Sequence, residues 1–276
     1  MSYYAGTSQT VGVTVSQPPS ISLSVSPGSP WQLNQTITLG VNMQGTPPAS
    51  TAQFYMVLQA QGNATIYLGS ATLQQTSSVP TYSATLQVTL TSPQSYSPAS
   101  GVTENMPVYG PVTFYATVGG FSSNQVSGTI LIPTKFTNIS VSPSTIYPGQ
   151  TVTVTGQLQQ VSTANSSQWT ALASQTISYT LTNSSGSTIT SGSATTNSSG
   201  DFTITFTAPS TAGSYTLDLV FAGSSSAYLA PAGVRIGFGS TTTSTTKLST
   251  TDLAILGGGI AVIGGLAAYE ALKRKK

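Results

Sequence analysis

Eight consecutive residues set the pattern from which the fold of this chain is predicted: Tyr147-Pro148-Gly149-Gln150-Thr151-Val152-Thr153-Val154. A Pro-Gly turn leads directly into valines that alternate with threonines. Such a period of two, with one set of side chains apolar and the other polar, predicts a β-strand that is buried on one face only. The same alternation recurs along the chain in apolar sets that we expect to face a core: Ile21, Leu23 and Val25; Ile37, Leu39, Val41 and Met43; Ala84, Leu86, Val88 and Leu90; Ile177, Tyr179 and Leu181; Phe202, Ile204 and Phe206; and Tyr215, Leu217, Leu219 and Phe221.

The chain also repeats itself, which predicts two similar domains. The matched pairs of segments are Val25-Ser26-Pro27 with Val141-Ser142-Pro143, 34–39 with 149–154, Ser70-Ala71-Thr72 with Ser193-Ala194-Thr195, and 114–120 with 217–223. Many short strands separated by Pro- and Gly-rich turns are typical of β-sandwiches. We therefore predict an N-terminal arm over 1–9, one sandwich over 10–133 and a second over 134–239, with the boundary near the proline of Ile132-Pro133-Thr134.

Three further segments carry a resemblance to a known family. They are Ile139-Ser140-Val141-Ser142-Pro143, Asn197-Ser198-Ser199-Gly200-Asp201-Phe202 and Ala212-Gly213-Ser214-Tyr215-Thr216-Leu217. Together with the opening stretch, they resemble the immunoglobulin-like modules of bacterial and archaeal surface proteins over residues 139–223, and the first unit resembles them more loosely. The resemblance implies sandwiches with a spacer or adhesion role, and it makes Tyr215 a candidate corner tyrosine. The chain has no cysteine, so the antibody subclass with its cysteine pair is excluded.

Residues 252–272 are a segment of a different kind, because from 253 to 268 they contain no charged residue and are apolar all round. A buried core helix would instead show polar residues at helical spacing. Twenty such residues in a helix span about 30 Å, the hydrocarbon thickness of a bilayer, so we predict a single C-terminal transmembrane α-helix. Its lipid anchors would be Leu253, Leu256, Ile260, Ile263 and Leu266, and a row of small residues for packing against another helix would be Gly257, Ala261 and Gly265.

The two flanks of this helix fix its predicted orientation. Residues 240–251 are rich in serine and threonine and predict a stalk, either a plain linker or an O-glycosylated one. The basic tail, 273–276, consists of Lys273, Arg274, Lys275 and Lys276. By the positive-inside rule, this tail lies on the cytoplasmic or interior face and the body lies outside.

The N-terminal residues leave the setting of the chain open. They lack the basic and apolar regions of a signal peptide. The leading hypothesis is a membrane-anchored surface protein of a cell envelope, in the style of archaeal envelope and stalk proteins, whose signal has been removed. The alternative is a penton, turret or spike protein of an archaeal virus with an internal membrane.

Charge is scarce, and this limits the partners that we expect. Only 4% of the 276 residues are charged, against roughly a quarter in ordinary soluble domains. The body carries no basic patch, so nucleic-acid binding is not expected beyond a weak contact of the basic tail inside a virion. The expected partners are the lipid membrane, neighbouring surface-lattice or capsid proteins, glycans, and a second copy of the chain in a homo-oligomer.

The residues that carry most enzyme chemistry are absent or scattered. There is no histidine to act as a base and no cysteine to bind metal or carry redox chemistry. The carboxylates of Glu104, Asp201 and Asp218 fall in different predicted hairpins. We therefore expect no enzyme activity, no metal and no cofactor.

Two sets of residues are candidates for carbohydrate chemistry. N-glycosylation sequons place acceptor amides at Asn34, Asn63, Asn138, Asn165, Asn183 and Asn197. Trp31 and Trp169 follow loops, so each could stack on a sugar ring. A third functional hypothesis is therefore a carbohydrate- or receptor-binding module. Tryptophan in a sandwich nevertheless more often fills the core.

Overall fold

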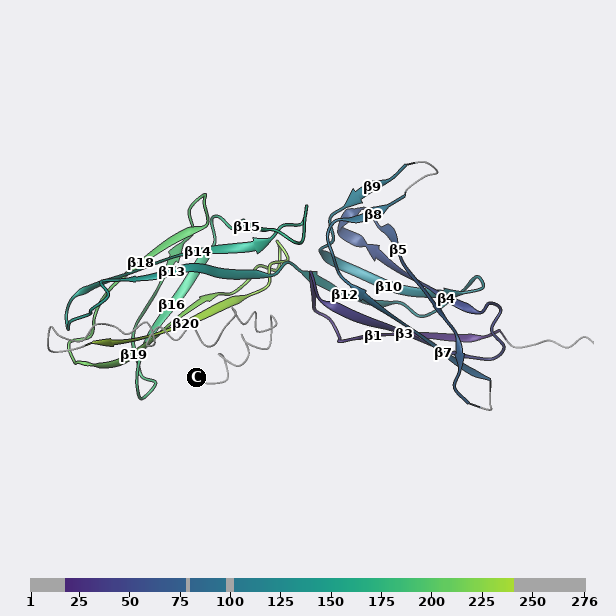
Figure 1. Cartoon of the computed structure of the whole chain (residues 1–276), viewed down its shortest axis with the longest axis horizontal. Coiled ribbons are helices and arrows are strands. Elements are labelled where there is room, and N and C mark those ends of the chain that lie inside the picture. The colour runs from purple at the N-terminus through teal and green to yellow at the C-terminus, as the bar shows by residue number, and fades with distance from the viewer. Residues whose placement is uncertain (1–17, 78–79, 98–101, 241–276) are drawn as a thin grey trace, which may run out of the picture.

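The computed structural model describes residues 18–77, 80–97 and 102–240, which form two β-sandwiches placed end to end along the long axis of the molecule (Figure 1). Within these residues the structure is all-β, as predicted, and the only helical turn there is η1 (Gln59–Gln61). No helix in these ranges is long and apolar enough to cross a bilayer. The predicted arm 1–9, the transmembrane segment 252–272 and the basic tail 273–276 lie outside the described residues.

The first sandwich consists of two sheets and a small hairpin. One sheet has the strand order β1 (Ser20–Ser26), β3 (Thr36–Gln44), β7 (Thr81–Thr89) and β6 (Gln74–Gln75). The other has the order β2 (Trp31–Gln32), β12 (Val126–Leu131), β10 (Gly110–Val118), β4 (Thr51–Leu58) and β5 (Ala64–Thr72), and β11 (Phe121–Ser122) pairs with β10. The hairpin pairs β8 (Gln94–Tyr96) with β9 (Glu104–Met106).

The second sandwich repeats this plan. Its first sheet has β13 (Thr134–Ser142), β14 (Thr151–Val161) and β15 (Trp169–Ala171), with β18 (Asp201–Thr207) also paired to β14. Its second sheet has the order β17 (Thr188–Thr195), β16 (Thr176–Asn183), β19 (Gly213–Phe221) and β20 (Ala232–Ser240). Ser240, predicted as the start of the stalk, is instead the buried last residue of β20.

Both sandwiches have the same strand arrangement, a variant of the immunoglobulin-like one in which the fourth strand pairs with the third. In each, the first, second and fifth core strands form one sheet, and the third, fourth, sixth and seventh form the other. The repeated segments of the sequence lie in equivalent strands of the two units, for example 34–39 at β3 and 149–154 at β14. The repetition in the sequence is therefore a repetition of the topology.

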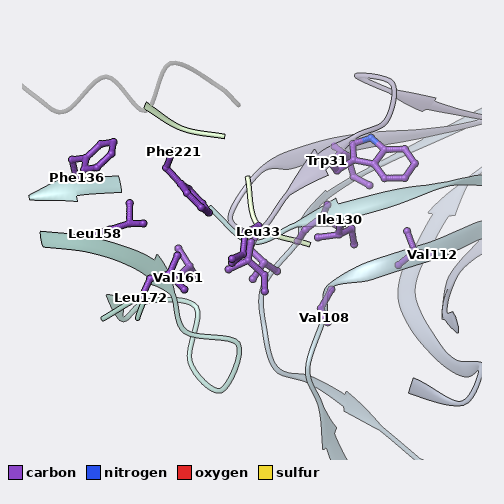
Figure 2. Packing of buried hydrophobic residues seen from close by; sticks show 14 of the residues in the cluster. Trp31, Leu33, Val108, Val112, Ile130, Phe136, Leu158, Val161, Leu172 and Phe221 are labelled. Atoms are coloured by element: carbon purple, nitrogen blue, oxygen red, sulfur yellow. The ribbon is translucent and has the colours of Figure 1, made fainter. Parts of the chain in front are cut away.

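Side chains from the predicted alternating positions fill the cores. Ile37, Leu39, Val41 and Met43 are all buried on β3, and the polar residues between them point the other way. The corner tyrosine is confirmed, because the Tyr215 hydroxyl donates a hydrogen bond to the Thr211 carbonyl oxygen at 2.6 Å. Buried apolar residues of both sandwiches belong to one continuous cluster, part of which is shown in Figure 2.

Candidate functional site

The covalent link between the sandwiches is held against the second sandwich by main-chain hydrogen bonds. Ile132, after β12, forms a parallel bridge with Leu229 in the loop between β19 and β20. The Ile132 amide donates to the Tyr228 carbonyl at 2.7 Å, and the Ala230 amide donates to the Ile132 carbonyl at 2.9 Å. The Thr134 hydroxyl donates to the Ala230 carbonyl at 2.7 Å. The link is thus part of the hydrogen-bonded structure and does not act as a free hinge.

A second connection joins the sandwiches through two buried serines, Ser92 before β8 and Ser166 before β15. The Ser92 amide donates to Ser166 Oγ at 3.1 Å, and the Ser166 amide donates to the Ser92 carbonyl at 2.8 Å. The Ser92 hydroxyl donates to the Thr163 carbonyl and accepts from the Val108 amide at 3.0 Å. The Asn34 amide nitrogen donates to the Ser166 carbonyl at 2.7 Å. Because the bonds of the Ser92 amide to Ser166 and of the Val108 amide to Ser92 are shielded from water, breaking either of them is costly.

Apolar side chains fill the space between the two connections. Leu33, Val108 and Ile130 of the first sandwich, and Val161 and Leu229 of the second, are each at most 5% exposed. Figure 2 shows Leu33 lying between Ile130 on one side and Val161 on the other. We call the junction the set formed by these residues, the link and the Ser92–Ser166 contact. A junction with buried apolar packing and paired polar groups holds two domains in one orientation.

The chain enters and leaves this two-domain body at opposite ends. β1 begins at Ser20, which pairs with Gln44 at the end of the first sandwich remote from the junction. β20 begins beside the junction and ends at Ser240, which pairs with Gly213 at the far end of the second sandwich. The described body is therefore an elongated unit, with the start of β1 near one tip and the end of β20 at the other (Figure 1).

Three tyrosines form a row across the outer face of one sheet of the first sandwich. Tyr55 on β4 pairs in register with Tyr67 on β5 and with Tyr115 on β10. The ring centroids of Tyr55 and Tyr115 are 5.0 Å apart with nearly parallel planes, and those of Tyr55 and Tyr67 are 5.5 Å apart. Tyr67 is 54% exposed. A bulge in the pairing of β4 with β5 between Phe54 and Tyr55 brings Tyr67 opposite Tyr55.

Polar but uncharged side chains border this tyrosine row. The Tyr55 hydroxyl donates to Gln53 Oε1 at 2.8 Å, and Gln59 Nε2 donates to Thr113 Oγ1 at 2.9 Å. Partial burial, and to a smaller degree the neighbouring Tyr55, raises the pKa of Tyr115 above its ordinary value. None of β4, β5 and β10 contains a charged residue. The row and its borders are therefore electrically neutral at physiological pH.

The structure corrects the prediction for Trp31 as a ligand-binding aromatic. Its side chain is 1% exposed, its ring packs edge-on against Phe114, and its indole N–H donates to the Pro27 carbonyl at 2.7 Å. A buried ring offers no face to a sugar. Trp169 is half-buried at the start of β15, and the ammonium of Lys135 lies 3.9 Å from the centre of its ring, so one face is already occupied.

The sequon asparagines lie at the surface but differ in what their amides do. Asn183 is half-buried and the other five are exposed. Asn183 and Asn197 use Oδ1 to accept hydrogen bonds from turn amides, including those of Ser187 and Asp201. The Asn34 amide nitrogen, the atom that a glycan would occupy, is already committed to the Ser166 carbonyl. Glycosylation at these six asparagines stays a prediction.

The carboxylates of the described residues do not come together. Glu104 is on β9 and Asp201 is at the start of β18. Asp218 on β19 pairs with Arg235 on β20, with Arg235 Nε 2.6 Å from Asp218 Oδ1. This hydrogen-bonded partner raises the pKa of Arg235. In 18–77, 80–97 and 102–240 no cluster of three or more acidic, histidine or cysteine side chains could hold a metal ion.

Sequence reasoning missed the tyrosine row, although a signal for it was present. Tyr55 stands between the inward-facing Phe54 and Met56, so the alternation places it on the outer face. The same rule applies to Tyr115 between Phe114 and Ala116. The register that aligns Tyr67 with them depends on the bulge and could not be read from the alternation.

Comparisons with known proteins give only a loose similarity. No protein family and no curated protein matches the sequence. Among solved structures, the adhesin InvE of Yersinia pseudotuberculosis matches with 13% identity over 80% of this chain and 58% of its own, at a TM-score of 0.27. The Escherichia coli adhesin FdeC matches with 16% identity over 80% of this chain and 65% of its own, at a TM-score of 0.29. The chain thus spans less than two thirds of either adhesin chain, and we draw nothing about its function from so loose a likeness.

Proposed function

We propose that this chain is a non-enzymatic, membrane-anchored surface protein in which two immunoglobulin-like sandwiches act as one stiff spacer. The observation that carries the proposal is the junction. It connects the sandwiches through buried hydrogen bonds from Ser92 and Ser166 and through the bridged link at Ile132, while β1 begins at one tip of the described body and β20 ends at the other. In a body built in this way, a membrane anchor at one end holds the opposite end at a fixed distance from the membrane.

The expected reach follows from strand geometry. The longest strand of the second sandwich, β14, has 11 residues. At about 3.3 Å per residue such a strand is roughly 35 Å long, so two sandwiches in tandem extend about 70 Å. We propose that the segment 252–272 anchors the end nearest Ser240, so that the first sandwich is held farthest from the bilayer and contacts a surface lattice, a matrix or another cell.

Two measurements on the full chain test this function. In a flotation assay with liposomes, the full chain should rise with the vesicles and a variant lacking 253–276 should stay at the bottom. Electron micrographs of the decorated vesicles should show a protein layer extending about 70 Å from the bilayer. If the deletion variant floats equally well, or the layer lies flat on the membrane, the proposed function is wrong.

A further inference from the structure

We propose that the outer face of β5, β4 and β10 binds a neutral carbohydrate, with the ring of Tyr67 stacked against the apolar face of a pyranose. This goes beyond the spacer role and does not depend on the membrane anchor. It assigns a ligand class to the row formed by Tyr67, Tyr55 and Tyr115, which the junction and the spacer geometry leave without a role.

The tyrosine row offers an aromatic surface that is held in place before any ligand arrives. Among the described residues, Tyr67 is the most exposed large hydrophobic side chain, at 54%. Its ring lies against Tyr55, which is itself stacked on Tyr115 with an angle of 13° between the planes. Rings that are already ordered lose little conformational freedom on binding, so stacking contributes more to affinity. An aromatic face and the C–H face of a sugar ring are complementary in shape and polarity.

The exposed polar groups around the row suit hydroxyl ligands. In register on one side of the row lies Thr65, and on the other lie Ser70 and Gln53, all three of them exposed. Hydroxyl and carboxamide groups both donate and accept, as sugar hydroxyls do. A pyranose stacked on Tyr67 would thus have hydrogen-bonding groups along both of its edges.

The charge of this face favours a neutral ligand. The three strands carry no charged side chain, and the tyrosine whose pKa is perturbed, Tyr115, is pushed toward its neutral form. A sulfated or carboxylated glycan, or a nucleic acid, would leave its charges without a cationic partner here. A neutral oligosaccharide needs no cationic partner.

A second copy of the chain is a poorer occupant of this face. A stable protein interface buries about 800 Å² on each partner, usually around several well-exposed anchors. Of the three rings, only Tyr67 is more than half exposed, while Tyr55 and Tyr115 are already half-buried by their neighbours. The row therefore provides one prominent ring and a polar surround, which matches a sugar ring better than a protein surface.

The test is binding of the full chain, kept in solution with mild detergent, to an array of neutral oligosaccharides printed beside sulfated ones. We expect binding to neutral structures, and Tyr67→Ala should weaken it roughly fivefold or more. Tyr67→Phe, which keeps the ring, should bind within about twofold of the unchanged protein. Phe121→Ala is the matched control, because it removes an aromatic ring that is 43% exposed on the same sandwich, outside the row, and it should leave binding unchanged.

Each other outcome overturns the proposal. Binding only to sulfated oligosaccharides would contradict the charge argument, and no binding to any neutral structure would contradict the proposal as a whole. Equal loss in Tyr67→Ala and Phe121→Ala would show that the row is not the site. If Tyr67→Ala abolishes self-association in sedimentation while neutral sugars never bind, the face is a contact between copies. None of these results bears on the liposome tests of the spacer function.

Discussion

Replacing Ser92 by alanine removes one hydroxyl from the junction and tests whether the two sandwiches move as one body. Ser92 is 3% exposed, and its hydroxyl has two partners, the Thr163 carbonyl in the second sandwich and the Val108 amide in the first. Alanine at this position leaves both partners without their hydrogen bond. The backbone bonds between Ser92 and Ser166 stay in place, so the change is confined to the hydroxyl.

The cost follows from the burial of the two partners. Val108 is 0% exposed, so its orphaned amide should cost the full penalty of about 1–3 kcal/mol. Thr163 is only half-buried, so water can reach its carbonyl in part and the loss there should be below about 1 kcal/mol. We expect Ser92→Ala to lower the free energy of unfolding by about 1–4 kcal/mol in denaturant titrations.

The orientation of the sandwiches can be measured in the same variant, because the chain has no cysteine of its own. Spin labels placed at Gln87→Cys and Ser198→Cys, both exposed and on different sandwiches, report the distance between the two units by double electron–electron resonance. The unchanged junction should give one narrow distribution, and Ser92→Ala should broaden it. Ser24→Ala is the control, because its hydroxyl bonds to the Gly40 carbonyl on the exposed surface of the first sandwich, and it should cost less than about 0.5 kcal/mol. If Ser92→Ala resembles Ser24→Ala in both stability and distance distribution, the junction is not what fixes the two sandwiches.

Three further outcomes follow from single residues. Tyr215→Phe removes the corner hydrogen bond to Thr211 and should lower thermal and chemical stability by about 1 kcal/mol with no change of fold by circular dichroism. Gly200→Ala should cost about 2 kcal/mol or more in denaturant titrations, because φ is +75° and a Cβ would lie 2.6 Å from the Leu158 carbonyl oxygen. The raised pKa of Tyr115 means that the folded state holds this proton more tightly than the unfolded chain, so its contribution is intact below about pH 10 and is lost as the pH rises through the folded-state pKa. Denaturation midpoints measured between about pH 8 and 11 should fall at the alkaline end, and less so in Tyr115→Phe.

The parts of the fold that were predictable are those set by neighbouring residues. Alternation identified the inward faces of β3 and β18, since Ile37 and Phe202 and their partners two residues on are all buried. Local pattern was sufficient because a strand in a sandwich buries one face wherever it sits in the sheet. The repeated segments were equally informative, because equivalent strands in two sandwiches meet the same requirements.

What could not be predicted depends on contacts between distant segments. Trp31 follows a proline in what reads as a loop, yet β2 pairs in parallel with β12 and turns the indole into the core against Phe114. Ser92 and Ser166 look like any of the many serines in the chain until the fold brings them within hydrogen-bonding distance across 74 residues. Short-range pattern holds no information about such pairings, one of which forms within the first sandwich and the other where the two sandwiches meet.

The docking also determines which surfaces are left for partners. In immunoglobulin-like sandwiches, loops gathered at one end commonly carry recognition. In the second sandwich, two such loops, 162–168 and 222–231, make the junction through Ser166 and Leu229. Ser166 and Leu229 are buried there, so these parts of the two loops are not accessible to a ligand. The sheet faces are not used by the junction, and the tyrosine row lies on one of them.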